Sequence, residues 1–545
     1  MADANRSLSL IPKDPELVIG LVGPLGADLR NVERELAKAL EGVGYIPMQI
    51  DILTIAQRLP NLEVSTPSSS DPSSVLSSYK MAVGTEIRRR TAMPDALALL
   101  GITAIRALRD QKRPSSDTTG PLPRHAYLLH QLKRPEEVES LRRVYGDGFL
   151  LVGVYSSRQR RIENLARGFY RGDRVGGANL EAAKLKATEL VNTDELESSN
   201  KKYGQAVRKT FEMSDVFLNA DVSIEELKAS VARVIHLLFW DPAVTPTQDE
   251  YAMFLAQGAA LRSADLGRQV GAAITSASGQ ILSLGTNEVA KPGGGMYWFG
   301  DEPDQRDICY QNRFDTNTDE KLRILGEVLT TIKSAGWLAE GKDPKDSSAL
   351  VELARGELKD SRLMSLIEFL RPVHGEMAAL MDAARVGIAV GGGTLYVTAF
   401  PCHECAKHIV AAGIRRVVFI EPYPKSQVAF LFTDSIRMDG QCADARVPFD
   451  QFCGIAPRRY QALFSMADKL FERNPDESFT VLCEGRRDGQ GQILDWERIK
   501  TKLSPKLTSY QQTYLGYEQI MVILLNSELQ KAGLALSPTP STHDQ

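Results

Sequence analysis

The sequence predicts an α/β protein of two domains, in which a doubly wound parallel sheet is followed by an α/β/α domain. The length of 545 residues is too great for a single hydrophobic core. Apolar strand segments alternate with helical segments through the first 245 residues, and a second alternation surrounds residues 374–420. We therefore expect domains over residues 1–245 and 246–536, with a helical insertion at about 297–370 and a disordered tail over 537–545.

The composition is that of an ordinary soluble protein, with 43% hydrophobic and 25% charged residues. The net charge of −4 gives no overall attraction to a polyanion, which argues against DNA or RNA as the bulk substrate. No apolar run is long enough to span a bilayer, and the first seven residues lack the pattern of a secretory signal. The expected location is the cytoplasm, without a membrane partner.

The first domain begins with an apolar strand, a loop containing glycines and an amphipathic helix over residues 31–40. Two segments rich in Ser and Pro, 60–78 and 112–123, are expected to be loops. The domain closes with a helix over 224–240 and a linker over 241–248. Strands are predicted from apolar and β-branched composition at 17–22, 45–50, 126–130, 149–155 and 216–218.

The glycine loop after the first strand is typical of a site where amide N–H groups at a helix start bind an anion. Its candidate nucleotide-binding residues are Gly20, Gly23, Gly26 and Asp28. No Gly-Lys-Ser/Thr closes the loop, so the lysine and hydroxyl that phosphoryl transfer requires are missing. With the arginines near residue 160, the pattern resembles a nucleotide-kinase fold that senses a nucleotide. The alternatives are a tight turn beside a solvated helix, and an active kinase.

The second domain begins with a helix over 250–262 and a hairpin of strands 269–275 and 280–284. Asn287 follows the hairpin and precedes a glycine-rich loop, where it could bond a sugar hydroxyl or stabilise the turn. The insertion is expected to be helical, as a lid, an oligomer contact or a decoration of the fold. Its helices are predicted at 320–338 and 347–370, and C-terminal helices at 459–473 and 510–530.

The strongest chemical signal is a histidine, a carboxylate two residues later and a downstream Pro-Cys-x-x-Cys. His374, Cys402 and Cys405 supply three ligands for Zn²⁺, as in a catalytic site that leaves one position open. Glu376 is then free to transfer protons to and from a nucleobase attacked by zinc-activated water. The alternative is a structural zinc, which would need a fourth ligand such as His403 or His408.

Helix and strand signals place these residues at two helix starts. A helix is expected from His374 to Arg385, because alanine, leucine and methionine dominate the segment. Pro401 suits the start of a second helix, whose amide dipoles would stabilise the thiolates of Cys402 and Cys405. Strands are predicted before it at 394–400 and after it at 417–420. The metal is therefore expected between two helix N-termini.

The motifs His374-Gly375-Glu376, 401–405 and 268–272 resemble the cytidine and deoxycytidylate deaminase family. Together with the first domain and segments 262–271, 421–426 and 454–460, they are similar to bacterial anti-phage deoxycytidine-nucleotide deaminases with a P-loop nucleotide-kinase-like N-terminal domain. The resemblance implies a zinc enzyme that converts dCTP and dCMP to deoxyuridine nucleotides and so depletes the pool a phage needs. It also implies a homo-oligomer, a regulatory nucleotide in the first domain, and a regulatory RNA or phage-derived trigger.

The resemblance assigns Asn287 to the sugar, while Lys425, Arg458 and Arg459 are candidate phosphate partners because polyphosphates need several cationic donors. Two departures bear on the substrate: Glu288 stands where deoxycytidylate enzymes usually have glycine, and Ala378 stands where simpler ones often have asparagine. Two other functions stay open at this point. One is deamination of a base within RNA or DNA, and the other is a nucleotide-binding regulator whose zinc only holds the fold.

Overall fold

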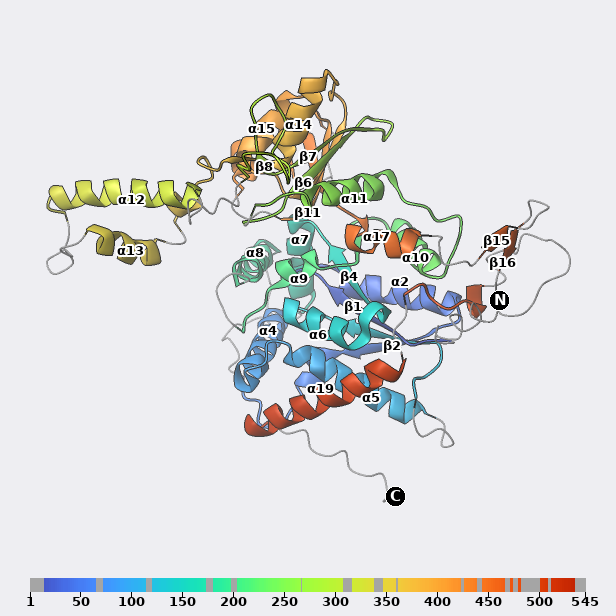
Figure 1. Ribbon diagram of the computed structural model, residues 1–545. Helices are drawn as coiled ribbons and strands as arrows, with labels where there is room; N and C mark the ends of the chain where they lie inside the picture. Colours follow the sequence, from blue (N-terminus) through green and yellow to red (C-terminus); the bar gives the residue numbers. More distant parts are fainter. Residues whose placement is uncertain are drawn as a thin grey trace, which may run out of the picture. The chain divides into compact units, whose positions relative to one another are not determined.

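The computed structural model describes residues 14–534, apart from 65–71, 114–119, 173–179, 198–202, 266, 307–315, 338–346, 359–360, 423–425, 439–443, 466–470, 474–478, 482–499 and 508–510. The described chain forms two compact units (Figure 1). The first comprises residues up to Glu250 together with those from Cys453 onward, and the second spans Tyr251–Phe452. Each contains a sheet with parallel strands, so the chain is a mixed α/β protein.

The sheet of the first unit confirms the predicted parallel arrangement. Within the described residues its strand order is β14-β5-β4-β1-β3-β2, and every pairing is parallel except β14 with β5. Each of the five predicted strands is present. The bounds are β1 (Leu17–Val22), β2 (Ile46–Asp51), β3 (His125–His130), β4 (Phe149–Tyr155), β5 (Val216–Asn219) and β14 (Gly454–Ile455).

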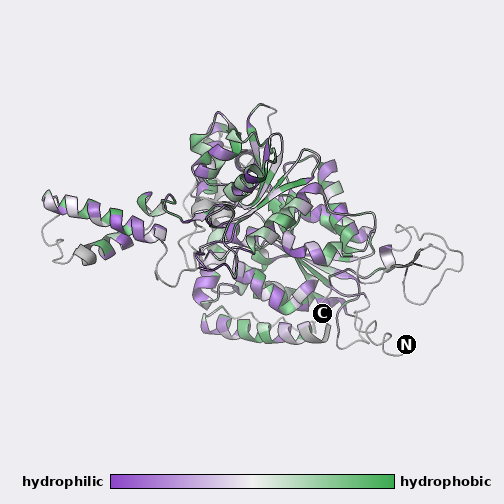
Figure 2. Cartoon of the chain, turned by 45° about the horizontal axis from the view of Figure 1, so that its top comes forward, coloured by the Kyte–Doolittle hydropathy of each residue, from purple (hydrophilic) through white to green (hydrophobic). Residues whose placement is uncertain are grey.

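Helices cover both faces of this sheet (Figure 1). Alternate residues of β1, such as Ile19 and Leu21, join one core with α2 and α10. On the other face, Gly101 of α5 packs against Leu129 of β3. Figure 2 shows hydrophobic strands between helices that also carry hydrophilic residues. The helices are α2 (Leu29–Gly42), α3 (Ile52–Ala56), α4 (Pro72–Thr91), α5 (Ala96–Lys112), α6 (Pro135–Tyr145), α7 (Arg158–Gly172), α8 (Leu180–Glu197), α9 (Val207–Glu212) and α10 (Ile224–Leu238).

The order of the strands creates a switch point at β1 and β3. From β1 the chain crosses to β2 on one side, whereas from β3 it crosses back to β4 on the other. The carboxyl ends of β1 and β3 therefore lead into loops that run in opposite directions. In open α/β sheets, ligands bind in the crevice that such an arrangement produces.

The C-terminal part of the chain belongs to the first unit, so the predicted assignment of residues up to 536 to the second domain is wrong after Phe452. β14 adds to the sheet edge at β5, and α17 (Pro457–Phe464) contributes Leu463 to the first core. The last helix, α19 (Gln511–Lys531), packs against α5. The predicted boundary is wrong because these apolar residues are buried against the first sheet. The order of residues along the chain does not reveal this contact.

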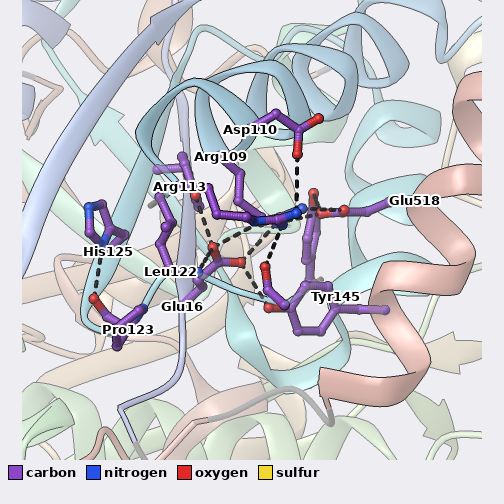
Figure 3. Close-up of polar contacts among 12 residues, drawn as sticks. Glu16, Arg109, Asp110, Arg113, Leu122, Pro123, His125, Tyr145 and Glu518 are labelled. Carbon is purple, nitrogen blue, oxygen red and sulfur yellow. Dashed lines mark hydrogen bonds and ion pairs between the residues drawn. The ribbon is translucent and has the colours of Figure 1, made fainter. Parts of the chain in front are cut away.

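A buried ionic cluster ties α19 to α5 (Figure 3). The Arg109 guanidinium of α5 donates to Glu16 from Nε at 3.0 Å and from Nη2 at 2.8 Å. It also donates to Glu518 of α19, from Nη1 at 2.7 Å and from Nη2 at 3.0 Å. The hydroxyls of Tyr127, Tyr145 and Tyr514 donate to the same two carboxylates. Each oxygen of the two acids therefore has a partner, as buried carboxylates require.

The sheet of the second unit has the order β12-β13-β11-β10-β6-β7 within the described residues. β6 pairs antiparallel with β7 and β10, while β10, β11, β13 and β12 run parallel in turn. The predicted hairpin and the two strands around the cysteines are confirmed. The strands are β6 (Gly271–Thr275), β7 (Ile281–Thr286), β10 (Thr394–Ala399), β11 (Arg416–Glu421), β12 (Ile436–Arg437) and β13 (Val447–Gln451).

Two glycines show that helices cover both faces of this second sheet. A Cβ on Gly271 would lie 2.0 Å from the carbonyl oxygen of Ala256 in α11 (Gln248–Ala260). A Cβ on Gly285 would lie 2.1 Å from the carbonyl oxygen of Gly375 in α14 (Gly375–Val386). Gly271 pairs with Thr286 and Gly285 with Ala272, so the two glycines face opposite sides of the sheet. The unit is therefore an α/β/α sandwich in which α14 presses directly on β7.

Gly285→Ala is expected to lower the free energy of unfolding by about 1–3 kcal/mol, because the added methyl must displace the backbone of α14. Denaturant unfolding of the two proteins measures the effect. The control is Gly258→Ala in α11, where nothing lies within 4 Å of the added Cβ and alanine favours the helix by up to about 1 kcal/mol. Equal stability of the two variants would contradict this packing.

The remaining differences from the predicted elements are local. Residues 72–78, predicted as loop, lie in α4, which begins at Pro72, a residue suited to a first helical turn. The predicted helix over 347–370 stops early as α13 (Ser347–Glu357), and that over 459–473 stops at Phe464. The predicted tail over 537–545 lies outside the described residues. Among those described, no single helix is long and apolar enough to cross a membrane, although the bent pair Tyr79–Thr91 and Ala96–Lys112 passes that test together.

Candidate metal centre and active site

Three possible metal ligands converge at two helix starts, as the sequence predicts. His374 is the N-cap residue of α14, and Cys402 is the N-cap residue of α15 (His403–Ala411). The Nδ1 atom of His374 lies 3.3 Å from the Sγ atom of Cys402 and 3.4 Å from that of Cys405. The backbone N–H of Cys405 donates to the Cys402 sulfur at 3.4 Å. Both thiols are buried at the positive end of the α15 dipole.

The neighbouring strands fix where these helices begin. β9 (Pro372–Val373) pairs with β8 (Glu288–Val289) and leads directly into His374. Phe400 directly follows β10, and its N–H donates to the Glu421 carbonyl at 2.7 Å. The Phe400 ring packs edge-on against Phe419 at 4.8 Å between centroids. The two ligand segments are therefore held by sheet pairing and core packing.

The titration of the three donors reflects their proximity. Hydrogen bonds with Cys405 and His374 lower the pKa of the Cys402 thiol to about 4, against the opposing effect of burial. Burial lowers the pKa of His374, but its hydrogen bond to Cys402 and the charge of Glu376 raise it to about 9. The hydrogen bond with Cys402, together with burial, raises the pKa of Cys405 well above its ordinary value. A bound cation would displace protons from His374 and Cys405, as soft metal sites do.

The donor set fits zinc. One imidazole nitrogen and two thiol sulfurs lie within 4.8 Å of one another, and the described residues contain no other such group. Two sulfurs and a nitrogen are ligands that Zn²⁺ prefers, and three protein ligands are typical of a catalytic zinc rather than a structural one. Neither His403 nor His408 belongs to the group, so neither of these two residues supplies the fourth ligand that a structural site would need.

Glu376 lies one residue into α14 and only 3% of it is exposed. Burial raises the pKa of its carboxyl to about 7, although the nearby His374 lowers it. A carboxyl with such a pKa can both accept and donate a proton near neutral pH. Glu376 is not part of the donor group and lines a cavity beside it.

The cavity has a volume of about 210 Å³ and opens beside the donor group. Its walls combine apolar side chains with a small number of polar ones, as small-molecule sites do. The lining residues are Asp265, Gly267, Arg268, Val270, Asn287, Ile367, Leu370, His374, Glu376, Ala399, Phe400 and Cys402.

Asn287, predicted to contact a sugar, does line this cavity, but its side chain already makes protein hydrogen bonds. Its Nδ2 donates to Asp265 at 2.9 Å and to the Arg268 carbonyl at 2.7 Å. Its Oδ1 accepts from the Val270 N–H at 2.6 Å. Both amide protons are used, so Asn287 positions Asp265, Arg268 and Val270 and could only accept one further hydrogen bond from a ligand.

Arg458 and Arg459, two of the predicted phosphate partners, are not among the residues that line the cavity. Arg459 is buried in the first unit, where it pairs with Asp215 at 3.2 Å and with Asp147 at 2.7 Å. Arg458 pairs with Asp215 at 3.3 Å and donates to the Met213 carbonyl. Both guanidinium groups therefore already pair with acidic residues of the first unit, and their binding to substrate phosphate stays a prediction. Lys425 lies outside the described residues.

The four residues predicted to bind a nucleotide in the first unit have packing and capping roles in the structure. Gly20 lies in β1 against Leu132 and Phe149, where a Cβ would approach Leu132 to 2.7 Å. Gly23 follows β1, and Gly26 has a φ of +88°, which favours glycine. The Asp28 carboxylate caps α2 by accepting from the Asn31 N–H at 3.1 Å. Nucleotide binding by these residues stays a prediction.

Several cavity residues escaped prediction from the sequence. Asp265 accepts from the Gly267 N–H at 2.7 Å, and Arg268 pairs with Glu421 at the end of β11. Ile367 and Leu370 come from the end of the helical insertion. The run of small and polar residues just before β6 was a detectable signal for Asp265 and Arg268. No sequence pattern pointed to Ile367 or Leu370, because their role depends on the return of the chain from the insertion.

The three candidate metal ligands lie in a part of the chain that matches a known protein-family model. Residues 246–421 match the protein-family model of the cytidine and deoxycytidylate deaminase zinc-binding region. Deoxycytidylate deaminase of Enterobacteria phage T2 is 35% identical over 88 residues, which cover 15% of this chain and 45% of that protein. ComE operon protein 2 of Bacillus subtilis is 31% identical over 83 residues, covering 14% and 44%. The chain spans less than half the length of these relatives.

Solved structures give a weaker comparison. The dCMP deaminase of cyanophage S-TIM5 in complex with dCMP and dUMP aligns with 38% of this chain and 98% of its own, at 18% identity and a TM-score of 0.22. The apo form of that enzyme gives a TM-score of 0.21 at 17% identity, covering 38% and 99%. At such low TM-scores these alignments do not establish a shared fold.

Proposed function

We propose that the second unit is a zinc-dependent hydrolase that deaminates deoxycytidine nucleotides, dCMP or dCTP, to the corresponding deoxyuridine nucleotides. The observation that carries the proposal is a buried carboxyl, Glu376, beside a three-ligand donor group in one cavity. The match of residues 246–421 to the deaminase zinc-binding region and the names of the relatives support the same chemistry. Depletion of deoxycytidine nucleotides as a defence against phage, which the sequence resemblance implies, belongs to this proposal.

The residues present account for the chemistry. Zinc held by His374, Cys402 and Cys405 would supply a Lewis acid that makes water nucleophilic near neutral pH. Addition of water at C4 of cytosine requires a proton at N3, and loss of ammonia requires a second proton on the leaving amine. Glu376 can take protons from the attacking water and deliver them to these two nitrogens, because burial raises its pKa to about 7. The balance is cytosine plus water giving uracil plus ammonia.

The cavity wall supplies the shape for a pyrimidine ring. Phe400, Ile367 and Leu370 offer apolar surfaces, and Ala399 lines the cavity at the end of β10. Asn287 holds Asp265, Arg268 and Val270 in place through three hydrogen bonds. A free nucleotide suits this enclosure, since a base within a nucleic acid would first have to leave its stack.

The helical insertion positions part of this wall. At the start of α12 (Thr316–Ser334), the Asn317 side chain donates from Nδ2 to the Leu366 carbonyl at 3.0 Å. Lys321 donates to the Met364 carbonyl at 3.4 Å. These bonds hold the backbone immediately before the cavity residue Ile367. We therefore assign Asn317 as a positioning residue, outside the reacting groups.

Asn317→Ala is expected to raise KM for the deoxycytidine nucleotide by about 2- to 10-fold, since a typical hydrogen bond contributes about 0.5–1.5 kcal/mol. The zinc content should not change, because Asn317 is not one of the three metal donors. Steady-state kinetics with a matched Thr330→Ala variant measures the effect, since the Thr330 hydroxyl donates to the Gly326 carbonyl within its own helix. An unchanged KM in Asn317→Ala would exclude the positioning role.

The proposed function is tested by incubating the zinc-loaded protein with dCMP, dCTP, CMP, CTP and a cytosine-containing oligonucleotide. Chromatography separates and quantifies the uracil products. We expect deoxyuridine nucleotides from dCMP, dCTP or both, at rates well above those of the ribonucleotides. Product formed from the oligonucleotide alone would instead favour a nucleic-acid deaminase, and no product from any of them would leave a structural zinc protein.

A further inference from the structure

The cavity of the second unit contains one arginine that the proposed chemistry does not use. Among the described residues that line the cavity, Arg268 is the only lysine or arginine. The carboxyl groups of Asp265 and Glu376 line the same cavity. A substrate phosphate, which is itself an anion, would therefore be attracted to Arg268 and repelled by these two acids.

The register of the strands shows where this arginine and its partner lie. Arg268 precedes β6 and Glu421 ends β11, and these two strands are the neighbours of β10 on its two sides. Val397 of β10 pairs with Ala272 of β6, and Ala399 pairs with Glu421. Because β6 runs antiparallel to β10, the residues just before β6 lie at the same end of the sheet as those just after β10. The ion pair between Arg268 and Glu421 therefore spans the end of β10.

This end of β10 is also an edge of the cavity. Phe400 and Cys402, which follow β10, line the cavity, and so does Arg268. Glu421 is not among the lining residues, so the ion pair draws the guanidinium from the cavity towards its edge. The carboxyl ends of parallel strands, here β10 and β11, are where ligands bind in open α/β sheets.

The backbone of Arg268 is held more firmly than its guanidinium. Its carbonyl accepts from Asn287 Nδ2 at 2.7 Å, and its N–H donates to Asp265 Oδ1 at 3.4 Å. The guanidinium pairs with Glu421 where the two side chains are 38% and 34% exposed. Ion pairs with this degree of exposure contribute little to stability, so the guanidinium can exchange its partner at little cost.

We propose that Arg268 binds the 5′-phosphate of the substrate, and that Glu421 holds the guanidinium at the cavity edge until the phosphate replaces it. Two phosphate oxygens accept the two parallel N–H groups of a guanidinium, and a phosphate carries more negative charge than a carboxylate. The exchange selects nucleotides over free nucleosides, a selection that rests on the function proposed above for the second unit.

Isothermal titration calorimetry with dUMP and dUTP, the products of the proposed reaction, tests the site in the zinc-loaded full-length protein. Arg268→Met should bind them about 10- to 100-fold more weakly than the wild type, because charge-assisted hydrogen bonds to phosphate are lost. Its affinity for deoxyuridine, which has no phosphate, should match that of the wild type. Arg268→Lys keeps the charge and should recover part of the loss. The control is Arg416→Met, which removes a 36% exposed arginine paired with Asp450 at the start of β11 and should bind like the wild type.

The other half of the ion pair should give the opposite result. Glu421→Gln frees the guanidinium, so dUMP and dUTP should bind about 2- to 5-fold more tightly than to the wild type. The double variant Arg268→Met/Glu421→Gln should bind like Arg268→Met alone, because the two side chains act through one interaction. The hydrogen bond from the Phe400 N–H is retained in each variant, since it is accepted by the Glu421 carbonyl.

Two results overturn the proposal. One is an affinity for dUMP and dUTP that is unchanged in Arg268→Met. The other is a Glu421→Gln variant that binds no more tightly than the wild type, in which case the ion pair only joins β11 to the segment before β6. These affinities do not depend on turnover. A failure of the proposed function is recognised separately, by the absence of uracil products from the wild type.

Discussion

Replacement of Glu376 by glutamine is expected to lower kcat for deamination by about 10²- to 10⁴-fold, the contribution typical of a general acid–base group. Glutamine preserves the size of the side chain but cannot carry a proton between the attacking water and the two nitrogens. Since Glu376 is not among the metal donors, the variant should retain its zinc. Rates of uracil formation and zinc content are measured on the same preparation.

The matched control is Glu404→Gln, which makes the same change between the two cysteines of the motif. The Glu404 side chain is 47% exposed, pairs with Lys407 on the surface of α15 and does not line the cavity. Its variant should deaminate at the wild-type rate. Comparable activity of Glu376→Gln and the wild type, or loss of zinc in Glu376→Gln, would show that Glu376 has another role.

Arg109→Met is expected to lower the free energy of unfolding of the first unit by about 3–5 kcal/mol. The guanidinium is 3% exposed and is shared by Glu16 and Glu518, so its loss leaves two buried carboxylates without a cation (Figure 3). The remaining tyrosine hydroxyls cannot neutralise them. Because Glu518 lies on α19, we also expect faster hydrogen exchange across that helix.

Arg89→Met is the control for this loss, since Arg89 also pairs with a glutamate but lies on the surface of α4. Exposed ion pairs contribute little, so its unfolding curve should stay close to that of the wild type. Denaturant unfolding, followed by circular dichroism, compares the three proteins. If Arg109→Met and Arg89→Met unfold alike, the buried cluster does not hold the C-terminal helix to the unit.

The metal centre is the part of the protein that local sequence predicts best. His374, Cys402 and Cys405 are fixed by short motifs at two helix starts, and the chemistry of zinc restricts which residues can serve. The strands that position them are also evident from β-branched and aromatic composition. Each of these signals depends on residues that lie close together in the sequence, so it can be recognised without a structure.

The predicted phosphate partners show where such reasoning stops. From its residue type alone, Arg459 would be expected to lie on the surface. In the structure it is buried against Asp215, which lies 244 residues away in the chain. The same is true of Glu518, whose partner Arg109 is 409 residues away. Contacts between such distant segments also assign the residues after Phe452 to the first unit. Nothing in the local pattern distinguishes these charges from solvated ones.

The residues of the cavity wall are also difficult to predict from the sequence. Asp265 and Asn287 meet through a hydrogen bond between a pre-strand turn and a strand end, and Leu370 arrives from the far side of a long insertion. Ala378, considered at the sequence level for substrate choice, is buried in α14. Which residues line the pocket therefore depends on where distant segments of the chain rejoin the sheet.

A titration of metal-free protein with zinc, followed by the rate of dCMP and dCTP deamination at each point, tests the central claim most directly. The claim is that His374, Cys402 and Cys405 hold one zinc, on which the activity of Glu376 depends. The rate should rise in proportion to added zinc and level off at one equivalent per chain, with no rise in Cys402→Ser. A rate independent of zinc, or zinc bound to one equivalent without deamination of either nucleotide, would contradict the account.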